Sequence, residues 1–169
     1  MYIEVDTYAM RQYTRLDDVS KILDLLLSNI SDSTLKRDAF VHLYGTGQAA
    51  SMIALMRGLS RKEAELSSIA GMLHDLYKYV APNDNEGHAN KCAHYAKEMV
   101  LDRLDSFTEE EKSLIFTAIA RHNRKEEIDE PIDEVLKDAD VLQHLLRSPM
   151  DDCFYNKSRA QKALKELMK

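Results

Sequence analysis

The sequence is poor in turn-forming residues: its 169 residues include only five glycines and three prolines. A β-rich chain of this length needs many tight turns, so this scarcity favours helices. No run of 18 apolar residues occurs, and we therefore expect no membrane-spanning segment. The first ten residues, MYIEVDTYAM, lack the basic and apolar regions of a secretory signal.

The sequence also has few cysteines and no net positive charge. The two cysteines, Cys92 and Cys153, lie far apart and form no metal-binding pair, which is typical of free thiols in a reducing cytoplasm. The net charge is −6 and the pI about 5.5, whereas a non-specific nucleic-acid binder needs the opposite sign. We therefore expect a cytoplasmic protein whose partners include neither duplex nucleic acid nor a membrane.

What the chain does contain is a series of amphipathic segments. Its 44% apolar and 31% charged residues are an ordinary globular balance, and its length fits one domain. Apolar residues at helical spacing predict an all-α bundle of six to eight helices, over residues 17–27, 34–57, 60–74, 87–104, 108–122, 129–147 and 158–168. We predict a single domain over 1–169, with a motif-bearing core at about 38–147 and the C-terminal helix 158–168 packing on it.

Local signals define several helix ends. Ser60 with Glu63, and Thr108 with Glu111, each have the spacing of a capping box. Asp129 fits the cap of the helix that follows it, with Pro131 at its first position. In the long second helix two glycines, at positions 45 and 47, come just after a histidine and predict a kink or a close approach of another element.

Several histidines and aspartates fall where a helix faces the core. His74 lies four residues after Ala70, with Asp75 next to it, and His122 continues an apolar stripe. Buried ionisable groups need partners, because an isolated charge in the interior is costly. A bound cation is one such partner, and imidazole with carboxylate suits Mn, Fe, Ni, Zn or Mg. Any one of these residues alone is explained as a core histidine or a capping aspartate, so the hypothesis rests on the set.

The arrangement of these residues resembles the HD-domain metal-dependent phosphohydrolase superfamily, in particular its small stand-alone bacterial members. The motifs are an isolated His42, the run Ala-Gly-Met-Leu-His-Asp over 70–75, and Asp-Ala-Asp-Val-Leu over 138–142. The resemblance covers about residues 38–147. It implies an HD-domain helical bundle in which His42, His74, Asp75 and a distal aspartate hold one divalent metal ion.

Two aspartates are candidates for the distal position. Helical spacing does not choose between Asp138 and Asp140. The family context, Ala-Asp followed by x-Leu, favours Asp140 as the ligand. Asp138 is then an alternative ligand or a group that orients one.

The resemblance extends to other positions. His88, in His-Ala-Asn-Lys-Cys-Ala, and His122, in Ala-Ile-Ala-Arg-His-Asn, are similar to family histidines that hold a second metal ion or contact substrate phosphate. Lys78 follows the His-Asp pair as a lysine does in many members, which implies a contact to a phosphate oxygen; a solvated lysine at a helix end explains it equally well. The remaining basic and imidazole side chains near these motifs are not counted among the predicted site residues: Arg121, Arg124, His94 and His144.

The resemblance implies a phosphohydrolase acting on a nucleotide or other small phosphoester through metal-activated water, with Asp75 accepting a proton. The alternatives are a metal-binding nucleotide sensor or protein-interaction module without turnover, and a helical scaffold without metal. The chain lacks the Gly-Tyr-Pro triplet of the family's cyclic-di-GMP phosphodiesterases. It also has Tyr77 and Lys78 where the alarmone hydrolases have two acidic residues. The apolar C-terminal helix could form a homodimer face or pack on the core.

Overall fold

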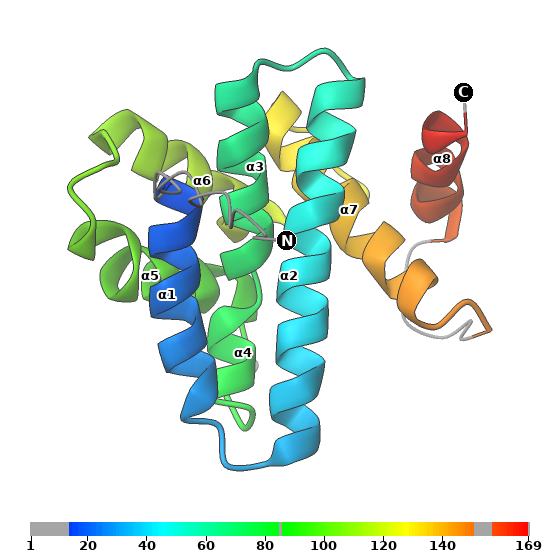
Figure 1. Cartoon of the computed structure of the whole chain (residues 1–169). Coiled ribbons are helices and arrows are strands. Elements are labelled where there is room, and N and C mark those ends of the chain that lie inside the picture. Colours follow the sequence, from blue (N-terminus) through cyan, green and yellow to red (C-terminus); the bar gives the residue numbers. More distant parts are fainter. Residues whose placement is uncertain (1–13, 85, 151–156, 169) are drawn as a thin grey trace, which may run out of the picture.

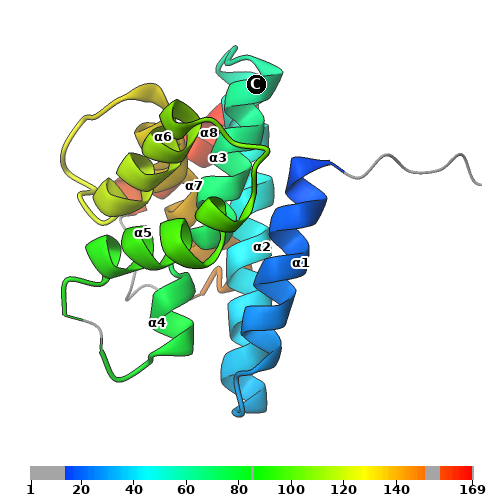
Figure 2. The ribbon, with the colours of Figure 1, turned by 90° about the vertical axis from the view of Figure 1, so that its left-hand side faces the viewer.

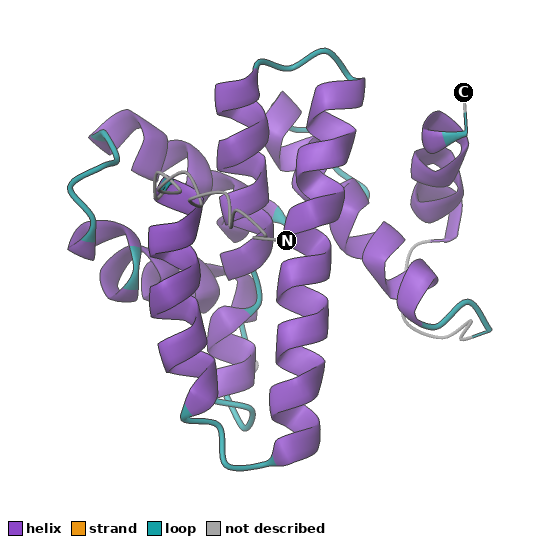
Figure 3. Cartoon of the chain, in the orientation of Figure 1, coloured by secondary structure: helices purple, strands orange, loops and turns teal. Residues whose placement is uncertain are grey.

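The computed structural model describes residues 14–84, 86–150 and 157–168, and this part of the chain is helical (Figure 1). None of its residues forms a strand, which confirms the predicted all-α class (Figure 3). The helices are α1 (Arg15–Ser28), α2 (Ser33–Met56), α3 (Arg61–Leu73), α4 (Leu76–Val80), α5 (His88–Met99), the 3-10 helix η1 (Leu101–Arg103), α6 (Glu109–Arg121), α7 (Pro131–Arg147) and α8 (Lys157–Leu167).

The helix starts follow the local sequence in most places. Both predicted capping boxes are present, with Ser60 before α3 and Thr108 before α6. The predicted cap at Asp129 is wrong: α7 begins after Glu130, and the Asp129 carboxylate lies 2.6 Å from the Lys137 ammonium instead. The helix expected over 87–104 is also divided, because α5 ends at Met99 and η1 follows it.

Helices α2 and α3 form an antiparallel pair at the centre of the fold (Figures 1 and 2). Helix α1 packs along this pair, and α5 and α6 pack on each other beside α3. Helix α7 packs against α2, and α8 packs on α7. The larger apolar core lies among α1, α2, α3, α5 and α6, with residues of α4 and the start of α7, whereas a smaller one joins mainly α2, α7 and α8. Ala160 and Ala163 of α8 are fully buried.

Helices α2 and α3 touch at Gly47 and Gly71. A Cβ atom on Gly71 would lie 2.8 Å from the Gly47 Cα, far closer than van der Waals contact. The close approach predicted after His42 is therefore confirmed, while α2 itself runs without interruption from Ser33 to Met56. This contact brings His42 of α2 beside His74 at the end of α3.

None of the helices in the described residues is both long enough and apolar enough to cross a membrane.

Candidate metal centre

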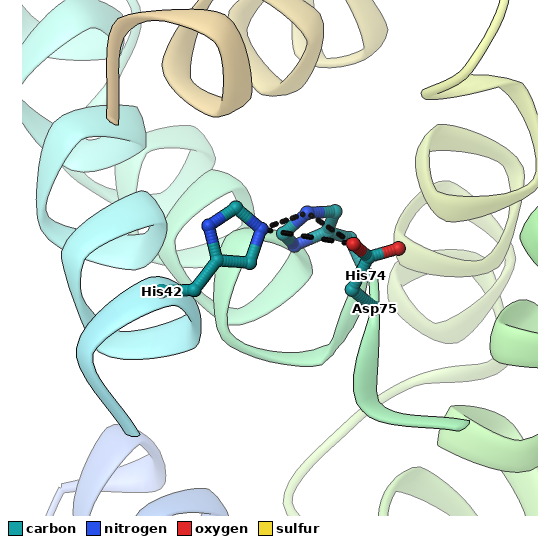
Figure 4. A group of neighbouring side chains, drawn as sticks. All are labelled: His42, His74 and Asp75. Carbon is teal, nitrogen blue, oxygen red and sulfur yellow. Dashed lines mark hydrogen bonds and ion pairs between the residues drawn. The ribbon is translucent and has the colours of Figure 1, made fainter. Parts of the chain in front are cut away.

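Residues from five helices meet in one buried cluster. His42 comes from α2, and His74 and Asp75 lie at the junction of α3 and α4 (Figure 4). The other members are the first residue of α5, the residue that ends α6, and two residues one turn apart on α7: His88, His122, Asp140 and His144. The structure thus brings together every residue predicted to hold a metal ion except the alternative Asp138.

The five imidazoles form a continuous row. From His144 the ring centroids are separated by 4.7 Å to His42, and then by 5.0 Å to His74. The row continues over 5.0 Å to His122 and 5.3 Å to His88. The two carboxylates, Asp75 and Asp140, lie alongside this row, each within 3.8 Å of two or more ring nitrogens.

Three of these rings have their Nδ1 atoms committed to hydrogen-bond acceptors. His42 Nδ1 lies 2.6 Å from Gln143 Oε1, His74 Nδ1 lies 2.8 Å from the Gly71 carbonyl, and His122 Nδ1 lies 2.7 Å from the Ile119 carbonyl. Each Nδ1 must therefore carry the proton and donate it. The Nε2 lone pairs of all three rings consequently face the cluster interior.

Each of the two carboxylates has a hydrogen-bond donor at only one of its two oxygens. Asp75 Oδ2 accepts a hydrogen bond from Lys78 Nζ at 2.8 Å, and Asp140 Oδ2 accepts one from Lys125 Nζ at 2.6 Å. Among the residues that the structure describes, Asp75 Oδ1 and Asp140 Oδ1 are buried without a hydrogen-bond donor. Buried acceptors without donors are rare, because leaving them unpaired is costly.

The donor atoms have the spacing of ligands around a shared ion. Two atoms bound to one ion at about 2.0–2.2 Å lie roughly 2.8–3.6 Å apart in tetrahedral or octahedral geometry. His42 Nε2 and His74 Nε2 are 3.2 Å apart, and each is 3.4 Å from Asp140 Oδ1. Asp75 Oδ2 is slightly further from these two nitrogens, at 3.7 and 3.8 Å. Inward lone pairs and unpaired oxygens at these distances fit a divalent cation.

A second group of donors surrounds the other oxygen of Asp75. Asp75 Oδ1 lies 3.4 Å from His122 Nε2 and 3.7 Å from His88 Nε2. Asp75 therefore presents one oxygen to each group of imidazoles, which is the arrangement of a carboxylate between two adjacent ion positions.

The ionisable groups of the cluster strongly affect one another's pKa values. Burial alone would raise the pKa of Asp75, but the neighbouring imidazoles outweigh it and hold that pKa well below its usual range. Burial likewise opposes ionisation of Asp140, yet Lys125 and His74 hold its pKa well below the usual range. Burial lowers the pKa of His74, and it lowers the pKa of His144 to about 4. Burial also opposes protonation of His42, but Asp75 and Asp140 outweigh it and raise the pKa of His42.

The alternative distal residue, Asp138, lies outside the cluster. One of its oxygens is 2.5 Å from an Arg57 nitrogen, and the other is 2.7 Å from an Arg159 nitrogen. Asp138 therefore ties α7 to α2 and α8. Arg159 also donates two hydrogen bonds, of 3.1 and 2.8 Å, to the carbonyl of Lys125, whose ammonium contacts Asp140. The structure thus connects Asp138 to the cluster indirectly, through Arg159 and Lys125.

The other residues considered from the sequence interact with partners outside the cluster. Arg121 pairs with Asp133 at 3.0 Å, and Arg124 pairs with Glu127 at 3.4 Å. His94 packs edge-on against an aromatic ring of α6, with centroids 4.9 Å apart. Cys92 is a buried free thiol, and Cys153 lies outside the described residues.

Sequence reasoning missed two residues at the cluster, Gln143 and Lys125. His144 was considered, because it lies one helical turn after Asp140 on the same face of α7, but it was wrongly left out of the predicted site. Gln143 orients His42 across 101 positions of sequence, and Lys125 reaches Asp140 from the α6–α7 loop. No local pattern marks either of these two.

Comparison with known proteins agrees with this geometry. The HD domain family matches residues 39–145, and the chain therefore belongs to the HD domain family. Its fold is similar to the crystal structure of a predicted HD superfamily hydrolase from an uncultured Thermotogales bacterium. The TM-score is 0.65 at 19% identity, covering 94% of this chain and 88% of that one. No curated protein matches the chain by sequence.

Proposed function

We propose that the protein is a divalent-metal-dependent phosphohydrolase that acts on a nucleotide or other small phosphoester. Membership of the HD domain family supports this proposal. The observation that carries it is the pair of buried carboxylate oxygens without donors, Asp75 Oδ1 and Asp140 Oδ1, facing imidazole lone pairs.

The distances between donor atoms support an assignment to two positions. His42, His74, Asp75 and Asp140 would hold one ion, and His88 and His122, with the other oxygen of Asp75, would hold a second or contact a phosphate. A divalent ion bound there supplies a Lewis acid and makes bound water more acidic. Asp75 contacts both groups and would accept the proton released by the attacking water.

Lys78 is suited to contact the substrate. Its ammonium lies 2.8 Å from Asp75 Oδ2, and its side chain is 41% exposed at the edge of the cluster. Burial of the Lys78 ammonium opposes its charge, but Asp75 outweighs this effect and raises the pKa of Lys78. Lys78 therefore stays charged beside the place where a phosphate oxygen would bind.

The local charge favours an anionic substrate despite the net charge of −6. The carboxylates of Asp75 and Asp140 are each balanced by one lysine, Lys78 and Lys125 respectively. Any bound divalent cation then makes the site positive, and such ions are often the largest charges in their surroundings. A phosphoester fits this charge better than a neutral or cationic substrate.

The test combines metal analysis with a hydrolysis screen. We expect purified, untagged protein to contain one or two equivalents of a divalent metal by plasma mass spectrometry, and Asp75→Asn to lose it. His94→Gln, which changes a histidine outside the cluster, should keep it. With that metal added, the wild type should hydrolyse p-nitrophenyl phosphate or a member of a nucleotide panel. Metal binding without hydrolysis of any member would favour the sensor function, and no metal binding would refute both.

A further inference from the structure

His144 lies at the end of the row of imidazoles where the family motifs give it no role. It follows Asp140 by one turn of α7, and its Nε2 is 3.5 Å from Asp140 Oδ1. Its ring centroid lies 4.7 Å from that of His42, and its side chain is 35% exposed at the edge of the cluster. His144 is therefore both part of the cluster and open to solvent.

The surroundings of Asp140 Oδ1 are nearly symmetrical. This oxygen lies 3.4 Å from His42 Nε2, 3.4 Å from His74 Nε2 and 3.5 Å from His144 Nε2. Hydrogen bonds between such atoms span about 2.7–3.2 Å, and Oδ1 has no hydrogen-bond donor among the described residues. The three distances instead match the separation of ligands that share an ion bound at about 2.0–2.2 Å.

An ion pair between a charged His144 and Asp140 does not explain this position. Asp140 already has a cation on its other oxygen, where the Lys125 ammonium lies at 2.6 Å. An imidazole nitrogen that shares an ion with Asp140 Oδ1 accounts for the 3.5 Å spacing without a second cation on this carboxylate.

We propose that His144 is a further ligand of the ion bound at Asp140 Oδ1, so that three imidazoles, those of His42, His74 and His144, surround this position. The inference rests on the proposed function, since it needs an ion there. Imidazole ligands favour late transition metals, whereas carboxylate and water ligands suit Mg²⁺ and Mn²⁺. His144 thus biases this centre towards ions such as Ni²⁺ or Zn²⁺.

The test compares His144→Gln with His94→Gln in protein stripped of metal by a chelator. Calorimetric titration should show that His144→Gln weakens Ni²⁺ binding about tenfold or more and weakens Mn²⁺ binding less. The visible absorption of the Co²⁺-loaded protein should change in His144→Gln, because one nitrogen ligand is lost. His94→Gln should match the wild type in both measurements. The comparison of His144→Gln with His94→Gln is then repeated in proteins that also carry His88→Gln, which alters the second group of donors. A loss of Ni²⁺ affinity that persists there belongs to the ion position at Asp140.

Two other outcomes would contradict the proposal. Equal Ni²⁺ affinity and an unchanged Co²⁺ spectrum in a folded His144→Gln protein would overturn the assignment of His144 while leaving the metal site intact. A wild-type protein that binds none of these ions would overturn the proposed function and this assignment together. Circular dichroism and the melting temperature of the metal-free proteins verify that both variants are folded.

Discussion

At the scale of single residues, two aspartates two positions apart on α7 have different surroundings. Residues two apart on a helix point about 200° away from each other, so Asp138 and Asp140 face opposite sides. Asp140 contacts His42 and His74, whereas Asp138 contacts Arg57 and Arg159. Both carboxylates are buried, but only that of Asp140 has an oxygen without a donor among the described residues.

Substituting the two aspartates should separate metal binding from stability. We expect Asp140→Asn to abolish binding of one metal ion and Asp138→Asn to retain it. Asp138→Asn should lower the free energy of unfolding by about 1–3 kcal/mol, because Arg57 and Arg159 each lose one of their two carboxylate partners and keep only Glu166 and Glu134, respectively. Metal stoichiometry and urea denaturation of the metal-free proteins test both expectations. Retention of full metal content by Asp140→Asn would show that Asp140 is no ligand.

Gln143 provides a second residue-scale prediction. Its Oε1 accepts the Nδ1 proton of His42 and thereby directs the His42 Nε2 lone pair into the cluster. Gln143→Met removes this acceptor and should weaken metal binding about 10- to 100-fold. Gln143→Glu keeps an acceptor at that place and should bind metal at least as tightly as Gln143→Met. Calorimetric titration of the three proteins distinguishes these outcomes, and equal affinity of Gln143→Met and the wild type would refute the orienting role.

At the scale of helices, the separation of α2 and α3 decides whether the first two histidines can meet. The two helices approach until the backbones of Gly47 and Gly71 are in contact. This contact determines the position of His42, because His42 lies little more than one turn before Gly47 in α2. His74 lies three residues after Gly71 and donates its Nδ1 proton to that residue's carbonyl. One glycine therefore sets both the helix spacing and the orientation of a ligand.

Adding a methyl group at Gly71 should force the two helices apart. The new Cβ would meet backbone atoms of Gly47 at 2.8 and 2.9 Å, which cannot move independently of α2. We expect Gly71→Ala to lower the free energy of unfolding by about 1–3 kcal/mol and to weaken metal binding. Ser67→Ala on the same helix is the matched control, because the buried Ser67 hydroxyl has no hydrogen-bond partner among the described residues. A Gly71→Ala protein as stable as Ser67→Ala would contradict this explanation.

At the scale of the whole molecule, an ion network away from the cluster joins three helices. The buried Glu111 of α6 lies 2.9 Å from Arg15 of α1 and 3.1 Å from Lys62 of α3. Burial alone would raise the pKa of Glu111, but Arg15, the Thr108 amide and Lys62 outweigh it and lower that pKa to about 2. Glu111 therefore stabilises the fold in its ionised form.

The pH dependence of stability follows from this shift. The pKa of Glu111 is about 2 in the folded protein and near 4.5 in the unfolded chain. Its contribution is therefore complete above pH 4.5 and is lost as the pH falls towards 2. Glu111→Gln should cost about 1–2 kcal/mol at pH 7, after allowance for the exposure of Lys62, and little at pH 2. Urea denaturation across this range, with the exposed Glu110→Gln as control, tests the prediction; a pH-independent difference would contradict it.

The sequence predicted the helical class and most of the cluster because both depend on local patterns. Apolar periodicity and capping boxes define α3 and α6, and His74 and His122 lie at the ends of these helices. The short α4 escaped prediction, since five residues are too few for a periodic stripe. Lys125 and Gln143 escaped it as well, because only the tertiary fold brings them to Asp140 and His42. The choice of Asp140 over Asp138 needed the family context, as helical spacing alone allowed either.

The contact of Arg159 with the Lys125 carbonyl has a consequence for how the protein can be divided. All the donor side chains of the cluster lie within the HD domain match at 39–145, but Arg159 belongs to α8, beyond its end. A protein cut to the boundaries of the family would keep every ligand and lose the group that holds the Lys125 backbone behind Asp140. Changes in the amphipathic C-terminal helix can thus alter the affinity of a site that it never touches.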